Sequence, residues 1–155
     1  MFNLGEILNI AMAIEESGIK FYKSAVRKYP EFLDVFSFLE KEEMKHLNEF
    51  RDLLNSVQDY TLNKELYPED YFSYLNAIGK NVVFKDEMLE QELQRLSSPQ
   101  DVIRFAMDME MKSINYYTFL KDLLKPEYTK GISLIIAEER KHYIKLAEIL
   151  DRLEK

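Results

Sequence analysis

Residues 38–50 of the chain read FLEKEEMKHLNEF, an amphipathic helical pattern that carries Glu43 and His46 on its apolar side. Leu39 and Phe50 share that side, because positions spaced alternately by four and three residues line one face of a helix. A carboxylate on a buried face needs partners, since burying an unpaired charge is costly. The pattern therefore predicts that other parts of the chain supply groups for Glu43 and His46 to contact.

The chain contains this pattern twice. The segment LIIAEERKHY (134–143) aligns with FLEKEEMKHL (38–47), and both carry Glu-Glu-x-Lys-His at equivalent positions. The preceding segments align as well, AMDMEMKSINYY (106–117) with AMAIEESGIKFY (11–22). We interpret the chain as a duplicated helical hairpin.

Apolar stripes with helical spacing predict four long helices. The expected helices span about 4–28, 31–57, 99–124 and 127–154. Ser-Pro-Gln-Asp at 98–101 has the form of a helix N-terminal cap. The segment 58–98 shows only short apolar groups, so we expect a long crossover with one or two short helices there. Four long helices with one long middle connection are typical of a ferritin-like four-helix bundle, and the expected fold is one all-α domain over residues 1–155.

The composition excludes several classes of function. A net charge of −7 and a pI near 5.0 disfavour binding to nucleic acid, and no cluster of Lys and Arg provides a basic patch. The absence of cysteine excludes disulfides, thiolate zinc sites and thiolate-bound iron–sulfur clusters. Any metal ion must therefore be held by oxygen and nitrogen ligands.

The apolar segments of the chain are short, and we expect a cytoplasmic protein without a membrane segment. The longest apolar run, ISLIIA at 132–137, is far shorter than the about 20 residues of a membrane-spanning helix. The first residues, MFNLGEILNI (1–10), lack the basic region of a signal peptide.

The duplication indicates which glutamate of the first and third helices faces the core. Glu15 aligns with Glu110, whereas Glu16 aligns with Met111. Glu15 and Glu110 also lie on the apolar stripes of their helices. These two residues are therefore the expected core acids.

The second and fourth helices each carry two adjacent glutamates. Glu43 and Glu139 lie on the apolar stripes, whereas Glu42 and Glu138 lie one position off them. Glu42 stays an alternative to Glu43, since a residue four positions before His46 also shares its helix face. We expect Glu43 and Glu139 to point into the core.

Each long helix thus places one glutamate near the middle of its buried stripe, and two helices add a histidine three positions later. The expected metal ligands are Glu15, Glu43, His46, Glu110, Glu139 and His142. Four ionised carboxylates in a dry core would repel one another, and two divalent cations would cancel their charge. Oxygen and imidazole ligands suit iron or manganese, with zinc as a further choice. The alternative is a helical bundle whose buried acids are protonated or partly exposed.

This ligand pattern, one glutamate from each of two helices and Glu-x-x-His from the other two, resembles that of the ferritin-like di-iron carboxylate proteins. AIEESGIKFY (13–22) and EEMKHL (42–47) more narrowly resemble the rubrerythrin branch. The resemblance spans all four long helices. It implies two iron ions held by the six residues above, with an oxo or hydroxo bridge when oxidised. It also implies that Tyr22 and Tyr117, each seven residues after a ligand glutamate, hydrogen-bond to ligand glutamates.

The chain departs from the rubrerythrin pattern at two points. Rubrerythrins carry a further glutamate ligand where this chain has Ser113. They also carry a cysteine-ligated rubredoxin domain, which a chain without cysteine lacks. The resemblance therefore implies a six-ligand site that receives electrons from an external donor protein such as a rubredoxin.

The expected function is that of a non-haem di-iron oxidoreductase that reduces peroxide or dioxygen. Two alternatives stay open: iron binding and oxidation for iron handling, and a metal-binding bundle without redox activity that holds manganese or zinc. The resemblance also implies a homodimer. The expected partners are an electron-donor protein and a second copy of the chain, with neither nucleic acid nor a membrane.

Overall fold

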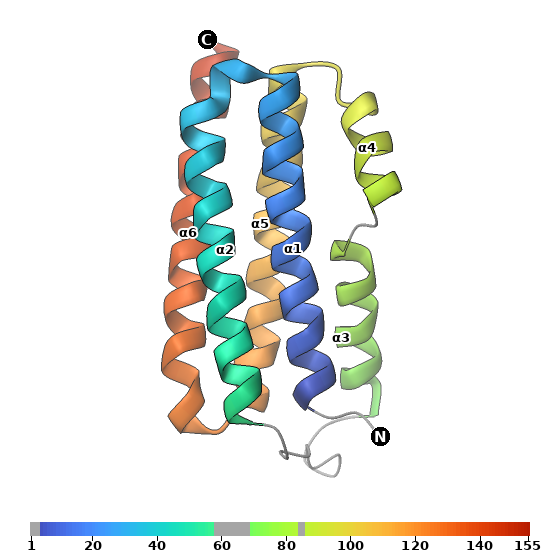
Figure 1. Ribbon diagram of the computed structural model, residues 1–155, viewed down its shortest axis with the longest axis vertical. Helices are drawn as coiled ribbons and strands as arrows, with labels where there is room; N and C mark the ends of the chain where they lie inside the picture. Colours follow the sequence, from blue (N-terminus) through green and yellow to red (C-terminus); the bar gives the residue numbers. More distant parts are fainter. Residues whose placement is uncertain (1–3, 58–68, 84–85) are drawn as a thin grey trace.

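The computed structural model describes residues 4–57, 69–83 and 86–155, and every regular element in these ranges is helical (Figure 1). The long helices are α1 (Leu4–Lys28), α2 (Leu33–Ser56), α5 (Pro99–Leu123) and α6 (Pro126–Glu154). The shorter elements are the 3₁₀ helix η1 (Pro30–Phe32) and the helices α3 (Glu69–Val82) and α4 (Asp86–Arg95). The expectation of an all-α fold is confirmed.

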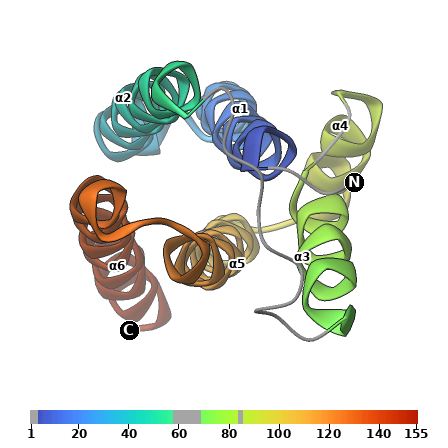
Figure 2. The same cartoon turned by 90° about the horizontal axis from the view of Figure 1, so that it is seen from below.

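The four long helices run side by side along the long axis of the molecule (Figure 1). α1 packs chiefly against α2, and α5 packs chiefly against α6, so two helical hairpins face each other. Seen from the end, α3 and α4 lie beside α1 and α5 (Figure 2). None of the described helices covers the opposite side, where α2 faces α6.

Local sequence explains where the long helices begin. Pro30 has no backbone N–H to continue α1 and opens η1 instead, so α2 begins at Leu33, slightly later than expected from the sequence. The expected cap of α5 is present: the Ser98 hydroxyl accepts a hydrogen bond from the Asp101 backbone N–H at 3.1 Å. Pro99 follows at the first helical position, where its missing donor costs nothing.

The segment expected to form the crossover, 58–98, contains α3 and α4. Its stretches 58–68 and 84–85 lie outside the described residues. α3 packs against α1 and α5, and α4 packs against α1. The Tyr71 hydroxyl of α3 also donates a hydrogen bond to the Phe119 carbonyl of α5 at 3.0 Å. The described part of the crossover therefore covers the side of the bundle where α1 meets α5.

Two apolar clusters fill the bundle, one toward each end. One cluster includes Leu8 of α1 and Leu120 of α5, and the other includes Phe36 of α2 and Ile103 of α5; all four are fully buried. Burying each such side chain contributes about 1.5–3 kcal/mol. Between the clusters lies a layer of buried polar residues: Glu15, Ser17, Glu43, His46, Glu110, Ser113, Glu139 and His142. The apolar packing on both sides therefore fixes the height of this layer.

The outer faces of the long helices are largely charged. Among the helices in the described ranges, none has both the length and the apolar character that crossing a membrane requires. The exposed large apolar side chains include Phe38 at 43% and Leu134 at 58%, which line hollows on the side where α2 faces α6.

Candidate metal centre

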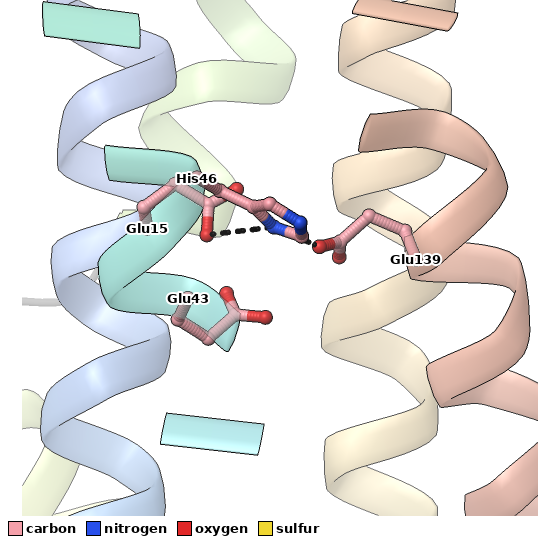
Figure 3. Close-up of side chains that lie close together, drawn as sticks. All are labelled: Glu15, Glu43, His46 and Glu139. Carbon is pink, nitrogen blue, oxygen red and sulfur yellow. Dashed lines mark ion pairs between the residues drawn. The ribbon is translucent and has the colours of Figure 1, made fainter. Parts of the chain in front are cut away.

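The structure brings all six of the expected ligand residues together in the polar layer. Glu15, His46 and Glu139 are completely buried, and the other three are 3% exposed. They come from all four long helices. Figure 3 shows how Glu15 of α1, Glu43 and His46 of α2, and Glu139 of α6 converge on the space between the helices.

The six side chains form two overlapping groups. The first group consists of Glu15, Glu43, His46 and Glu139. The second group consists of Glu43, Glu110, Glu139 and His142. Within each group, one oxygen or nitrogen atom per residue lies within 4.8 Å of those of the others, so each group could hold a metal ion. Glu43 and Glu139 belong to both groups, and their carboxylates lie between the two.

His46 directs its Nδ1 atom into the centre. This atom lies 2.7 Å from Glu139 Oε1 and 3.7 Å from Glu15 Oε2 (Figure 3), but neither approach has the alignment of a hydrogen bond. The other ring nitrogen, Nε2, lies 2.6 Å from Glu138 Oε2 on the outer side of the ring. One nitrogen of His46 is thus oriented by a carboxylate outside the centre, and the other, without a hydrogen-bond partner, faces the carboxylates inside it.

His142 faces the centre with the same two nitrogens from the other hairpin, but at longer distances. Its Nδ1 lies 3.7 Å from Glu110 Oε2 and 3.8 Å from Glu43 Oε1, and its Nε2 lies 3.8 Å from Glu42 Oε2. The rings of His142 and His46 stack with centroids 5.9 Å apart. The two halves of the duplication therefore meet in the centre as near-equivalent halves.

The two tyrosines that the resemblance singled out lie beside these carboxylates. Tyr22 of α1 donates a hydrogen bond to Glu110 Oε1 of α5 at 2.7 Å. Tyr117 of α5 donates to Glu15 Oε1 of α1. Burial and then the neighbouring carboxylates raise the pKa of both hydroxyls well above the usual value, so both remain protonated donors. Each tyrosine fixes one oxygen of a glutamate and leaves the other oxygen facing the centre.

All six residues have at least one buried atom without a hydrogen-bond partner among the described residues. These atoms are Glu15 Oε2, Glu43 Oε1, His46 Nδ1, Glu110 Oε2, Glu139 Oε1 and Oε2, and His142 Nδ1. Leaving one buried polar atom unsatisfied costs about 1–3 kcal/mol. A set of converging oxygen and imidazole nitrogen atoms with this need fits a cation that accepts such ligands.

The protons in the metal-free centre are unevenly distributed. Burial, and then repulsion from neighbouring glutamates, raises the pKa of Glu43 and Glu139 well above the usual value. Burial also opposes the ionisation of Glu110, but its contacts with Glu139 and His142 outweigh this and lower its pKa. Burial disfavours the charged form of His46, yet its carboxylate partners raise its pKa to about 9. Without a cation, the centre therefore balances its charge by holding protons.

Glu42 and Glu138, which the sequence places one position off the buried stripes, contact the histidines from outside. Each reaches the histidine of the opposite hairpin, and both are partly exposed. Glu42 therefore belongs to neither inner group, although it shares a helix face with His46. Sequence reasoning missed this role, although the doubled glutamate in both copies was a visible signal. A carboxylate on the outer nitrogen of a ligand histidine fixes its tautomer and increases its basicity.

Gly18 makes room for Glu43. A Cβ atom at this position would lie 2.7 Å from Glu43 Oε2, too close for any real contact. Ser113 occupies the equivalent position in the second hairpin, where it is buried and its hydroxyl donates to the Met109 carbonyl at 3.0 Å. Neither residue supplies a seventh carboxylate to the centre.

The chain matches no protein-family model, and no curated protein or solved structure shows significant similarity to it.

Proposed function

We propose that this protein is a non-haem di-iron carboxylate oxidoreductase, a ferritin-like bundle of the rubrerythrin branch that reduces peroxide or dioxygen with electrons from an external donor protein. One observation carries the proposal: two overlapping groups of buried ligand atoms share Glu43 and Glu139. Two shared carboxylates are what a two-metal site needs, because bridging ligands hold two ions about 3.5–4 Å apart.

The charge of the residues also supports two divalent ions. Four glutamates would contribute four negative charges in a buried layer, and two divalent cations would neutralise them. The remaining ligands would be two imidazole nitrogens, which are neutral when they bind a cation, and the absence of cysteine leaves no thiolate. Such a donor set suits iron or manganese better than the softer metals.

In the proposed function, side chains of this chain orient the metal ligands and keep bulk water away from them. Two bound iron(II) ions would supply the two electrons that convert one peroxide and two protons into two waters, and the donor protein would return these electrons. Glu138 orients His46, Glu42 lies 3.8 Å from the outer nitrogen of His142, and Tyr22 and Tyr117 orient two of the glutamates. The apolar clusters above and below keep bulk water out of the layer.

A second candidate is iron binding and oxidation without turnover of peroxide. Ser113 favours this candidate, because the resemblance implies a further glutamate ligand at this position in rubrerythrins. The Ser113 hydroxyl instead donates a hydrogen bond to a backbone carbonyl. A non-redox bundle that holds manganese or zinc uses the same donor atoms. The homodimer implied by the resemblance is part of the proposal as well.

The experiment that tests the proposal is metal analysis by mass spectrometry of protein purified without oxygen, followed by near-ultraviolet spectra during stoichiometric peroxide addition. We expect about two irons per chain and a spectral change that reverses on reduction. Tight, peroxide-inert manganese or zinc would instead support the non-redox alternative. A single oxidation that never cycles would support the second candidate.

The chain offers a matched control for this experiment. Glu15→Gln removes a buried ligand, whereas Glu16→Gln alters its exposed neighbour. Both variants change the net charge by the same amount. Metal content should fall in the first variant and stay unchanged in the second. Equal metal content in both variants would contradict the proposed centre.

A further inference from the structure

Two hollows open on the uncovered side of the bundle, where α2 faces α6. The acidic mouth, of about 480 Å³, is lined by Lys45, Glu49, Asp52, Glu127 and Glu138 among other residues. The basic mouth, of about 390 Å³, is lined by Phe38, Glu42, Lys45, Glu138, Lys141, His142 and Lys145. Lys45 and Glu138 line both, so the two mouths adjoin at the level of the centre.

The duplication relates the two mouths, but their charges differ. Glu49 of the acidic mouth is equivalent in the alignment to Lys145 of the basic mouth. Leu134 of the acidic mouth is likewise equivalent to Phe38 of the basic mouth. A hollow whose lining carries an excess of one charge concentrates counter-ions and accelerates their capture. The two sides of one symmetric centre therefore offer a divalent cation very different approaches.

The acidic mouth has a strong excess of carboxylates. Lys45 is the one basic residue among those that line it, and its Nζ lies 3.0 Å from Glu138 Oε1. Glu49, Asp52 and Glu127 remain as negative charge around the hollow. The charge of this mouth attracts a cation.

The inner end of the acidic mouth leads to a ligand atom of the centre. Glu138, which lines both mouths, lies 2.6 Å from Nε2 of His46. His46 is fully buried, and its Nδ1 has no hydrogen-bond partner and lies 2.7 Å from Glu139 Oε1. Glu138 is thus the residue through which this mouth contacts a histidine of the centre.

The basic mouth is unsuited to the same task. Its lining carries Lys45, Lys141 and Lys145 against the carboxylates of Glu42 and Glu138, so it has no excess of negative charge, and Lys145 Nζ lies 4.2 Å from the centroid of the Phe38 ring. That ring packs edge-on against His142, with centroids 6.1 Å apart. A hydrophobic side chain with an ammonium group above it covers the histidine on this side.

We propose that divalent cations load into the centre through the acidic mouth and that Glu138 receives them before His46. The inference rests on the proposed metal centre, and it adds the route by which the centre fills. Loading through this mouth depends on the charge of residues that contact neither metal position, so rate and final occupancy can be separated.

The test is stopped-flow absorption of Co²⁺ binding to metal-free protein at low ionic strength, together with the final cobalt content. The variant Asp52→Asn/Glu127→Gln removes two charges from the mouth and should slow loading about ten-fold, with final occupancy unchanged. The control is Glu148→Gln/Glu31→Gln, in which Glu148 is the duplication equivalent of Asp52 and Glu31 is that of Glu127. It removes two exposed charges and should load at the wild-type rate. Added salt should slow the wild type and the control more than the mouth variant.

A third variant, Glu49→Lys, gives the acidic mouth the charge found at the equivalent position of the basic mouth and should load slowest of all. Equal rates in the mouth variant and the control would overturn the route, while full cobalt occupancy would leave the centre intact. Absence of cobalt binding by the wild type would overturn the proposed centre and the route with it.

Discussion

His46 of α2 and Glu138 of α6 are joined across the two hairpins, with Nε2 and Oε2 2.6 Å apart. Glu138 also contacts Lys45 at 3.0 Å. The Glu138 side chain is partly exposed, whereas His46 is fully buried. Because the outer carboxylate holds the ring, the inner nitrogen of His46 keeps a fixed direction toward Glu139.

Replacing this carboxylate should weaken metal binding. Glu138→Ala removes the partner of His46, and we expect metal affinity to fall about 10–100-fold, as for other outer partners of ligand histidines. The matched change Glu42→Ala should cost less, because Glu42 lies 3.8 Å from His142. Equilibrium titration with Co²⁺ measures both affinities. An equal loss in the two variants would contradict the role of the shorter contact.

Adding one methyl group at Gly18 should disturb the centre. Gly18→Ala places a Cβ atom 2.7 Å from the present position of Glu43 Oε2, so this carboxylate must move. We expect weaker metal binding. The free energy of unfolding should change by only about 1 kcal/mol, because the higher helix propensity of alanine opposes the cost of moving the carboxylate. The control is Ser113→Ala at the equivalent position, which should leave metal binding unchanged. Thermal melts and metal titrations of both variants test this.

Removing either tyrosine hydroxyl should destabilise the metal-free protein. Tyr22→Phe and Tyr117→Phe each leave a buried carboxylate oxygen unsatisfied, which costs about 1–3 kcal/mol. Tyr116→Phe provides the control, because its hydroxyl donates to the Ile7 carbonyl at 3.0 Å, away from the centre. Urea unfolding should show losses in all three variants. Metal affinity should change only in the first two, and a change in all three would argue against a specific role at the centre.

The stability of the metal-free protein should fall as pH rises. Glu43 and Glu139 have raised pKa values, so their stabilising protons are fully bound below the usual 4.5 and are lost as pH rises through the raised values. His46 contributes in the same direction, with stability present below 6.5 and lost as pH rises through about 9. Glu110 and Glu138 have lowered pKa values, and their contribution is lost as pH falls below 4.5.

The free energy of unfolding with a chelator present should therefore be highest in mild acid and decline toward about pH 9. Metal binding should show the opposite trend, because ligands must lose protons to bind a cation. Urea titrations across this range, with and without Co²⁺, measure both slopes. A metal-free protein that becomes more stable toward alkaline pH would contradict this distribution of protons.

Metal should also stabilise the folded chain. A cation that binds only the native state raises its stability by about 2.7 kcal/mol at a hundred-fold excess over Kd. We expect the melting temperature to rise with Co²⁺ and to return to its starting value with chelator. The Glu15→Gln variant should show a smaller rise than Glu16→Gln.

The sequence predicted the parts of the structure that depend on repeated local patterns. Leu39, Glu43, His46 and Phe50 lie on one stripe by spacing alone, and the structure buries all four. Comparison of the two copies selected Glu15 over Glu16, and Glu15 is buried while Glu16 is exposed. Duplication was informative because each copy provided an independent record of the same buried positions.

The features that the sequence did not predict depend mostly on contacts between distant segments. The contact of Glu138 with His46 joins two hairpins, and no pattern within one helix indicates it. The room that Gly18 leaves for Glu43 is likewise a contact between two helices. The start of α2 at Leu33, two residues later than expected, depends on the 3₁₀ turn that the chain forms over Pro30–Phe32, which an apolar stripe does not describe.

The crossed contacts of the polar layer also determine how the two hairpins are aligned along the bundle axis. Apolar stripes repeat with each turn, so they alone would tolerate a slip of one helical turn, about 5.4 Å, between the hairpins. Such a slip would separate Tyr22 from Glu110 and Tyr117 from Glu15, and it would set carboxylates against leucine and phenylalanine. Because that arrangement buries unpaired polar groups, the layer excludes it. The residues that gather at the centre thus determine the axial register of the two hairpins.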